Sequence, residues 1–217
     1  TKHRFIYASS LMYIDRCLKK FFEHMKREKI LDDTLVLITS DHGSEYAESP
    51  RKKANIGERN HYEYIDVPMI ISPKINKNIK RNICDSMGMT ATFLDLLQVP
   101  LDKSYKGKSI FSAGKSFVIS ESAGSGNADI LRRDIFFTIT DQNYKLMTQL
   151  TDKKLKIIKF FNLREDPYEL NNLFNYKKNI SHLILNKLLK NLYEERKNIF
   201  KIRGVNSYDN YLKHIKF

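Results

Sequence analysis

The 217-residue sequence predicts an α/β fold with a small antiparallel subdomain after it. Segments typical of buried strands alternate with amphipathic helical segments over the first part of the chain, which favours a parallel sheet with helical connections. Residues 134–162 instead have the pattern of strands joined by short turns. We therefore expect an α/β part over residues 1–130, an antiparallel subdomain over 131–175, and a helix and tail over 176–217.

The composition is that of a folded chain with an excess of positive charge. Lys and Arg number 38 against 25 Asp and Glu, a net charge of +13, and 41% of the residues are apolar. This charge favours an anionic partner, such as nucleic acid, an anionic membrane surface, or a sulfated or phosphorylated substrate. The basic residues are spread along the chain without a nucleic-acid-binding motif, so we expect no nucleic-acid binding. Two cysteines are too few for a disulfide framework.

The ends and apolar runs of the chain give weaker information. The apolar runs are too short to span a bilayer, and membrane association stays open. The first ten residues lack the apolar core of a signal peptide. The chain begins with Thr1 and not with Met, which we interpret as a cut or processed chain.

The first element is a helix, predicted over residues 8–29, and a strand follows it. Apolar residues recur there at three- and four-residue steps, with charged residues on the other faces. Two aspartates end the helical pattern, and residues 34–39 form a nearly continuous apolar run. Such a run is typical of a strand buried on both faces, as in a parallel sheet.

Polar residues follow this strand directly, beginning with Ser40, Asp41, His42 and Gly43. Open α/β sheets bind their ligands at the carboxyl ends of the strands. A carboxylate oxygen beside an imidazole nitrogen is a ligand pair for a divalent cation, and Gly43 lets the backbone turn closely past an ion. The alternative is that Asp41 caps the next turn and that His42 is an ordinary surface residue.

A long polar segment, residues 44–61, separates this strand end from the next strand. Loops of this length in a compact domain are usually functional or disordered. His61, at its end, is a candidate metal ligand, oxyanion contact or proton donor, or else a histidine without a task. Lys52, Lys53 and Arg59 are candidates to bind an anionic ester, or else solvated loop charges.

The remaining elements follow from the same patterns. A second buried strand is expected over residues 67–71, a helix over 83–98 with Met87, Thr90, Phe93, Leu94 and Leu97 on its apolar side, and a third short strand over 117–120. Residues 134–150 and 155–162 predict antiparallel strands. The last helix, predicted over 178–200, carries an apolar side of Ile180, Leu183, Ile184, Leu188, Leu192 and Ile199.

Several of these segments together resemble the second half of a sulfatase of the alkaline phosphatase superfamily. Three of them lie in the α/β part: Tyr13 to Asp15 before the first strand, Ser40 to Gly43 after it, and the strand at 67–71. The helical segment 90–97, which leads into Val99 and Pro100, matches more loosely. Residues 161–173 resemble the C-terminal signature of that family closely, with its Asn-Leu, Asp-Pro, Glu and Asn-Leu pairs.

The resemblance implies an alkaline-phosphatase-like doubly wound sheet and a divalent metal at the strand ends. Asp41 and His42 match the metal-binding pair, and His61 is the nearest match to the catalytic residue that contacts the sulfate or the leaving group. The sequence departs from the family's frequent Asp-His-Gly-Glu form, because Ser44 stands where Glu is common. Ca²⁺ is expected first, with Mg²⁺, Mn²⁺ and Zn²⁺ also possible. The resemblance also favours a periplasmic or secreted location.

The family's nucleophile has no match in this chain. No Cys-x-Pro-x-Arg or Ser-x-Pro-x-Arg segment occurs, because neither Cys17 nor Cys84 is followed by the required proline. We therefore expect a C-terminal portion of a sulfatase, inactive alone, whose partner is the N-terminal half of the same protein. Two alternatives stay open: a phosphoethanolamine- or phosphoglycerol-type transferase of the same superfamily, and a non-catalytic sulfatase-like module.

Overall fold

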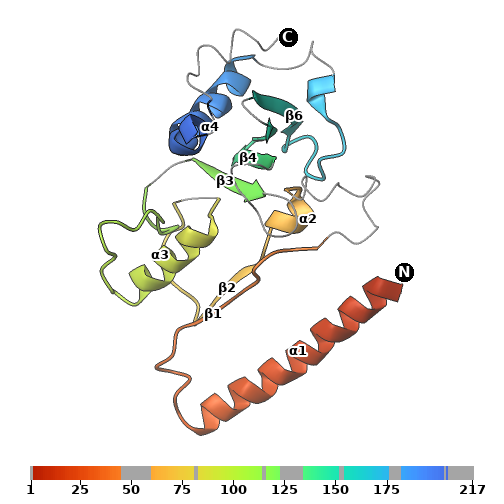
Figure 1. Cartoon of the computed structure of the whole chain (residues 1–217). Coiled ribbons are helices and arrows are strands. Elements are labelled where there is room, and N and C mark those ends of the chain that lie inside the picture. The colour runs from red at the N-terminus through yellow and green to blue at the C-terminus, as the bar shows by residue number, and fades with distance from the viewer. Residues whose placement is uncertain are drawn as a thin grey trace.

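A computed structural model describes residues 2–44, 60–80, 83–113, 116–122, 134–151, 154–175, 182–202 and 204. Two parts share the chain (Figure 1): an N-terminal part with helices and a two-stranded sheet, and a C-terminal part in which helix α4 covers a four-stranded sheet. The α/β class and the antiparallel subdomain expected from the sequence are confirmed. The elements in chain order are α1 Lys2–Arg27, β1 Val36–Thr39, α2 Tyr62–Ile65, β2 Met69–Ser72, α3 Ser86–Leu96, β3 Phe117–Ser122, β4 Ile135–Asp141, β5 Tyr144–Thr151, β6 Lys154–Asn162, η2 Leu173–Asn175 and α4 His182–Ile202.

Helix α1 starts earlier than predicted and ends at a Schellman motif. Lys29 adopts φ 56°, and the Ile30 amide donates to the carbonyl of Met25 at 3.0 Å. These bonds satisfy carbonyls that the last helical turn leaves free. Helix α3 ends in the same way at Gln98, with φ 58°, and begins with the Asp85 carboxylate accepting from the Gly88 amide at 2.7 Å.

The pairing of β1 with β2 is antiparallel, so the parallel arrangement predicted for these strands is wrong. Val36 faces Ser72, and Thr39 faces Met69. The expected burial on both faces is also absent, since Ile70 is 56% exposed while Met69 and Ile71 are partly buried. An apolar run indicates that a segment pairs and packs, but it does not encode the direction of its partner.

The C-terminal sheet has the strand order β3-β4-β5-β6, and all of its pairs are antiparallel. The third predicted strand thus pairs with β4 and not with β1 or β2. The Asp141 carboxylate accepts from the amides of Asn143 and Tyr144 and closes the tight β4–β5 turn.

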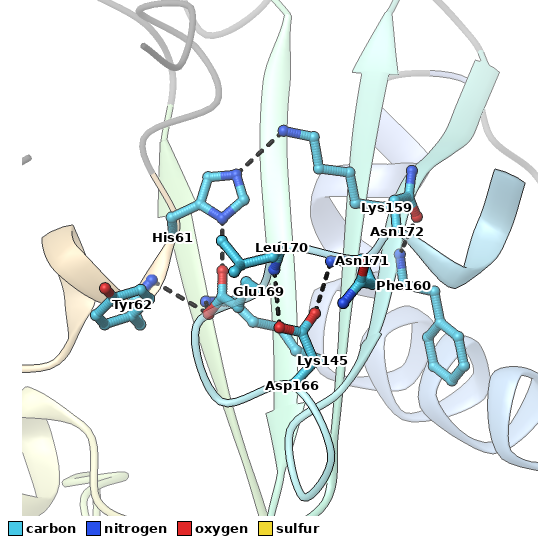
Figure 2. A network of polar contacts seen from close by, with 10 residues as sticks. All are labelled: His61, Tyr62, Lys145, Lys159, Phe160, Asp166, Glu169, Leu170, Asn171 and Asn172. Carbon is cyan, nitrogen blue, oxygen red and sulfur yellow. Dashed lines mark hydrogen bonds and ion pairs between the residues drawn. The ribbon is translucent and has the colours of Figure 1, made fainter. Parts of the chain in front are cut away.

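Alternate side chains of this sheet face α4 and form the main core, because successive residues of a strand point to opposite faces. The buried core residues are Ile135, Phe137, Ile139, Leu146, Leu150, Leu155, Phe160, Leu185, Leu188, Leu189, Leu192 and Phe200. Leu188 and Leu192 confirm the predicted apolar side of the last helix, whereas Leu183 is 81% exposed. Lys145 directly precedes the core residue Leu146, and Lys159 directly precedes Phe160, so both lysines lie on the opposite face, where Figure 2 shows them beside Glu169 and His61.

The predicted apolar side of α3 is only partly correct. Its buried residues are Gly88, Ala91 and Thr92, while Met87 and Leu97 are exposed. The small residues let the helix approach the 105–110 segment closely, since the Thr92 hydroxyl accepts from the Ile110 amide at 3.1 Å. Within the part of the chain that the structure describes, no helix is both long and apolar enough to cross a membrane.

Candidate metal and substrate site

The polar turn after β1 places the Asp41 and His42 side chains in solvent, where they are 85% and 69% exposed. One carboxylate oxygen of Asp41, Oδ1, accepts from the backbone N–H of His42 at 2.9 Å. The Ser40 hydroxyl donates to the His42 carbonyl at 2.8 Å. These local bonds hold the turn and leave the second carboxylate oxygen of Asp41 open.

The His42 ring is held in one tautomer. Its Nδ1 lies 2.7 Å from the carbonyl oxygen of Gly43, and a carbonyl only accepts, so Nδ1 carries the proton. In the neutral ring Nε2 then keeps its lone pair, and it lies 3.7 Å from Asp41 Oδ2. Metal-binding histidines are oriented in the same way, by donating their other N–H to a carbonyl or carboxylate.

Asp41 is held in its charged form. The hydrogen bond from the His42 backbone N–H, and then the charge of the His42 ring, keep the pKa of Asp41 below its usual range. An ionised carboxylate oxygen and an imidazole lone pair fit a divalent cation. They make up only part of a coordination shell, because the described residues contain no group of three His, Cys, Asp or Glu side chains that could hold a metal ion.

A cleft of about 1090 Å³ opens beside this turn. Its walls come from residues 40–44, from 64–67 at the end of α2, from the start of α3, and from β3. Three further carboxylates, Asp66, Asp85 and Glu121, are among the lining residues, and no Lys or Arg is among those that the structure describes. The predicted substrate-binding residues Lys52, Lys53 and Arg59 lie outside the described residues.

Gly43 joins the turn to α2 at very short range. Its amide donates to the carbonyl of Tyr64 at 2.8 Å. A Cβ atom at this position would lie 1.9 Å from the carbonyl oxygen of Glu63. Glycine is therefore required here for the close approach of two backbones.

Replacing Gly43 by Ala is expected to separate the turn from α2, because a methyl group cannot occupy the space of the Glu63 carbonyl. Amide exchange at Gly43 and Tyr64, followed by NMR, should become faster by at least about 10-fold, the equivalent of roughly 1.4 kcal/mol. Ala substitution at Ser44, an exposed neighbour, is the control. Unchanged protection in the Gly43→Ala chain would contradict the geometry.

His61 does not point into the cleft but is buried, with 2% of its surface exposed. Its Nδ1 lies 2.5 Å from Glu169 Oε2, and its Nε2 lies 3.1 Å from Lys159 Nζ. Because an ammonium group only donates, Nε2 accepts and Nδ1 donates to the carboxylate. Both ring nitrogens are engaged within the protein, and the catalytic role expected for His61 stays a prediction.

Glu169 lies at the centre of this buried network (Figure 2). Its Oε1 accepts from Lys145 Nζ at 2.6 Å and from the Tyr62 amide at 3.2 Å. Burial alone would raise the pKa of Glu169, but the hydrogen bond from His61 and the charge and hydrogen bond of Lys145 outweigh it, so that the pKa is lowered. The carboxylate is thus ionised in the folded protein.

The C-terminal signature, residues 161–173, folds into a compact loop that positions the Glu169 carboxylate, and we call it the C-terminal signature loop. The two oxygens of Asp166 accept from the amides of Leu170 and Asn171 at 2.9 and 2.7 Å. The Asn172 side chain binds the backbone of β6 at Phe160 and Ile158 (Figure 2). The sequence analysis identified this signature but did not predict that Glu169 and Lys159 contact His61, or that Lys145 contacts Glu169.

Comparison with known proteins supports the class suggested by the fold and the turn. A family model for sulfatases matches residues 4–99, a segment that includes Asp41, His42 and His61. The multifunctional alkaline phosphatase superfamily protein PehA of Trinickia caryophylli is 24% identical over 191 residues, covering 78% of this chain and 36% of that protein.

Solved structures with a similar fold agree with this match. BT4656, solved in complex with its substrate D-glucosamine-2-N,6-O-disulfate, superposes with a TM-score of 0.65 at 19% identity, covering 91% of this chain and 41% of that one. BT1596, a 2-O GAG sulfatase, gives a TM-score of 0.59 at 18% identity, with 79% and 40% covered.

The chain is thus an α/β protein with the fold of part of a sulfatase. The match of the sulfatase family model to residues 4–99 and the distant likeness to an alkaline phosphatase superfamily protein support the sulfatase resemblance that the sequence motifs predicted. The chain spans 36% of the length of the PehA protein and about two fifths of the solved chains it resembles.

Proposed function

We propose that this chain supplies part of the active site of a metal-dependent sulfatase-like hydrolase that cleaves sulfate esters. The observation that carries the proposal is the turn after β1, where an Asp41 carboxylate oxygen and Nε2 of His42 lie 3.7 Å apart beside a large cleft. This turn lies inside the segment that matches the sulfatase family.

The chemistry follows from these two side chains. Asp41 and His42 would hold a divalent cation, with Ca²⁺ first among the candidates and Mg²⁺, Mn²⁺ or Zn²⁺ also compatible with oxygen and imidazole ligands. Such a cation supplies Lewis-acid stabilisation of the negative charge on the ester oxygens. In the neutral His42 ring the Gly43 carbonyl favours the tautomer with the proton on Nδ1, which leaves the lone pair on Nε2 for a cation.

The proposed substrate is a sulfated sugar or a related anionic ester. BT4656 has a sulfated glucosamine as its substrate, and this chain carries a net charge of +13. The described lining of the cleft is acidic, so positive charge for the substrate must come from elsewhere. We propose Lys52, Lys53 and Arg59 for that role, because they come shortly before Asn60, which lines the cleft.

We further propose that the nucleophile and the remaining metal ligands come from a part of the sulfatase fold that this sequence does not include. The surface of α1 supports this view. Among the described side chains of α1, only Met25 is buried, and Figure 1 shows the helix standing apart from the two sheets. Its exposed apolar residues are Phe5, Ile6, Tyr7, Leu11, Met12, Tyr13, Ile14 and Phe21. Exposed apolar residues in this number on one helix favour a protein interface.

The isolated 217-residue chain is therefore expected to self-associate through α1. Replacing Leu11 and Ile14, which lie one turn apart and are about half exposed, by Lys should shift the chain toward the 25.6 kDa monomer in analytical ultracentrifugation. Lys20→Gln changes the polar side of the same helix and is the control. Equal mass distributions for the double variant and the control would contradict the role given to this face.

The proposed activity is tested by product analysis with the full-length protein. We expect inorganic sulfate to be released from D-glucosamine-2-N,6-O-disulfate, release to stop with a chelator, and activity to return with Ca²⁺ or another divalent ion. Release of phosphate from phosphate esters, without sulfate release, would favour the transferase alternative that the likeness to a multifunctional superfamily protein keeps open. Cation binding without turnover of either ester would indicate a non-catalytic module.

A further inference from the structure

The Glu169 carboxylate collects three donors from segments that are far apart in the sequence. His61 Nδ1 and the Tyr62 amide come from the start of α2, and Lys145 Nζ comes from the start of β5. The side chains of His61, Lys145 and Glu169 are all at most 3% exposed. The buried Glu169 carboxylate thus links the C-terminal signature loop to the N-terminal part of the chain.

Two lysines of the antiparallel sheet complete this junction. Lys145 pairs in register with Phe161, and Lys159 pairs with Met147, so the two lysines are diagonal neighbours on one face of the sheet. Lys145 binds the carboxylate, and Lys159 donates to His61 Nε2. The His61 ring also packs edge-on against Phe161, with 5.8 Å between ring centroids. The His61 ring is therefore held by Lys159 and Phe161 of β6 and by Glu169 of the loop after β6.

Helix α2 connects this junction to the candidate metal ligands. It has only four residues, Tyr62–Ile65, and the His61 carbonyl accepts from the amides of Tyr64 and Ile65 at 2.9 and 3.2 Å. At its other end the Tyr64 carbonyl accepts from the Gly43 amide. Gly43 directly follows Asp41 and His42, and its backbone packs so closely against the Glu63 carbonyl that a Cβ atom would not fit between them. A displacement of α2 must therefore move the turn as well.

We propose that Glu169 is a positioning residue for the Asp41–His42 turn and acts on it through His61 and α2. This inference rests on the proposed function, because it assigns the positioned turn a cation-binding task. Glu169 does not line the cleft, so it acts on the site without touching substrate or cation. It gives the C-terminal signature loop a role in the site formed by the N-terminal part.

The test compares Glu169→Gln, which keeps the size of the side chain and removes its charge, with Glu165→Gln in the same loop. Glu165 is exposed and serves as the matched control. The amide signals of Gly43 and Tyr64 in the 217-residue chain are followed by NMR, and Mn²⁺ is titrated as the cation probe into the full-length protein, which adds the remaining proposed ligands. We expect Glu169→Gln to shift both signals and to weaken Mn²⁺ binding by about 10-fold or more, as loss of an outer partner of a metal ligand does.

Glu169→Asp keeps the charge opposite Lys145 and shortens the side chain, so it decides the matter if Glu169→Gln does not fold. Unchanged Gly43 and Tyr64 signals in a folded Glu169 variant, or unchanged Mn²⁺ affinity, would overturn the inference. If the unsubstituted full-length protein binds no Mn²⁺ but the Gly43 signal moves in the Glu169 variants, the positioning holds and the proposed function fails. The two failures are thus distinguishable.

Discussion

Replacing Asp41 by Ala is expected to lower the affinity for a divalent cation by at least about 100-fold, more than the loss of an outer-shell partner. Asp41 contributes an ionised carboxylate at the end of β1. Within the described residues, no further His, Cys, Asp or Glu side chain joins Asp41 and His42 to form a group of three that could hold a metal ion. Metal-dependent ester hydrolysis by the full-length protein should fall to the background rate. Isothermal titration with Ca²⁺ and Mn²⁺ measures the first effect, and sulfate release measures the second.

Stability provides the control for this substitution. Asp41 is 85% exposed, so the free energy of unfolding should change by no more than about 0.5 kcal/mol. Asp33→Ala, another exposed aspartate near β1, should leave both cation affinity and turnover unchanged. A variant Asp41→Ala that binds the cation as tightly as Asp33→Ala would remove Asp41 from the metal site.

The largest loss of stability is expected at Glu169. Substitution by Ala leaves the ammonium group of Lys145 buried without its carboxylate, and breaking a buried ion pair costs about 3–5 kcal/mol. Urea unfolding followed by circular dichroism measures this loss. Glu23→Ala breaks only an exposed pair with Lys19 and should cost less than about 1 kcal/mol.

A second substitution separates the charge from other effects at this position. Adding Lys145→Met to Glu169→Ala removes both charges and should restore part of the stability, because no uncompensated ammonium group remains. If the double variant is as unstable as the sum of the two single variants, the two charges do not interact in the way that their 2.6 Å contact implies.

The same carboxylate makes stability depend on pH. Folding lowers the pKa of Glu169, so the unfolded chain binds the proton more tightly than the folded chain does. The stabilisation from this group is complete above its unfolded pKa of roughly 4.3 and is lost as the pH falls through the folded pKa. The stability of Glu169→Gln should therefore fall less steeply below pH 4.3 or so than that of the unsubstituted chain.

Local sequence patterns predicted the elements well because each element depends on its own residues. The tight β4–β5 turn is one of the short turns predicted within residues 134–162, and its bonds are made within four residues. The end of the first strand was correctly predicted as the place of Asp41 and His42, because the apolar run stops there. The early start of α1, by contrast, adds residues whose apolar side is not covered.

Features that depend on contacts between distant segments were not predictable in this way. The antiparallel direction of β2 depends on how the connection after Gly43 returns, which no run of residues encodes. The contact between His61 and Glu169 joins residues 108 positions apart. A lysine in the middle of a predicted strand, such as Lys145, was the one local sign of a buried charge network, because an unpaired lysine is rarely buried.

Anomalous scattering from Mn²⁺ in crystals of the full-length protein tests the central claim most directly. The account predicts a peak within coordinating distance of both an Asp41 carboxylate oxygen and Nε2 of His42, at the edge of the cleft beside β1. A peak bound by other side chains, or a map in which Asp41 and His42 point away from each other with no ion between them, would contradict the proposed metal site.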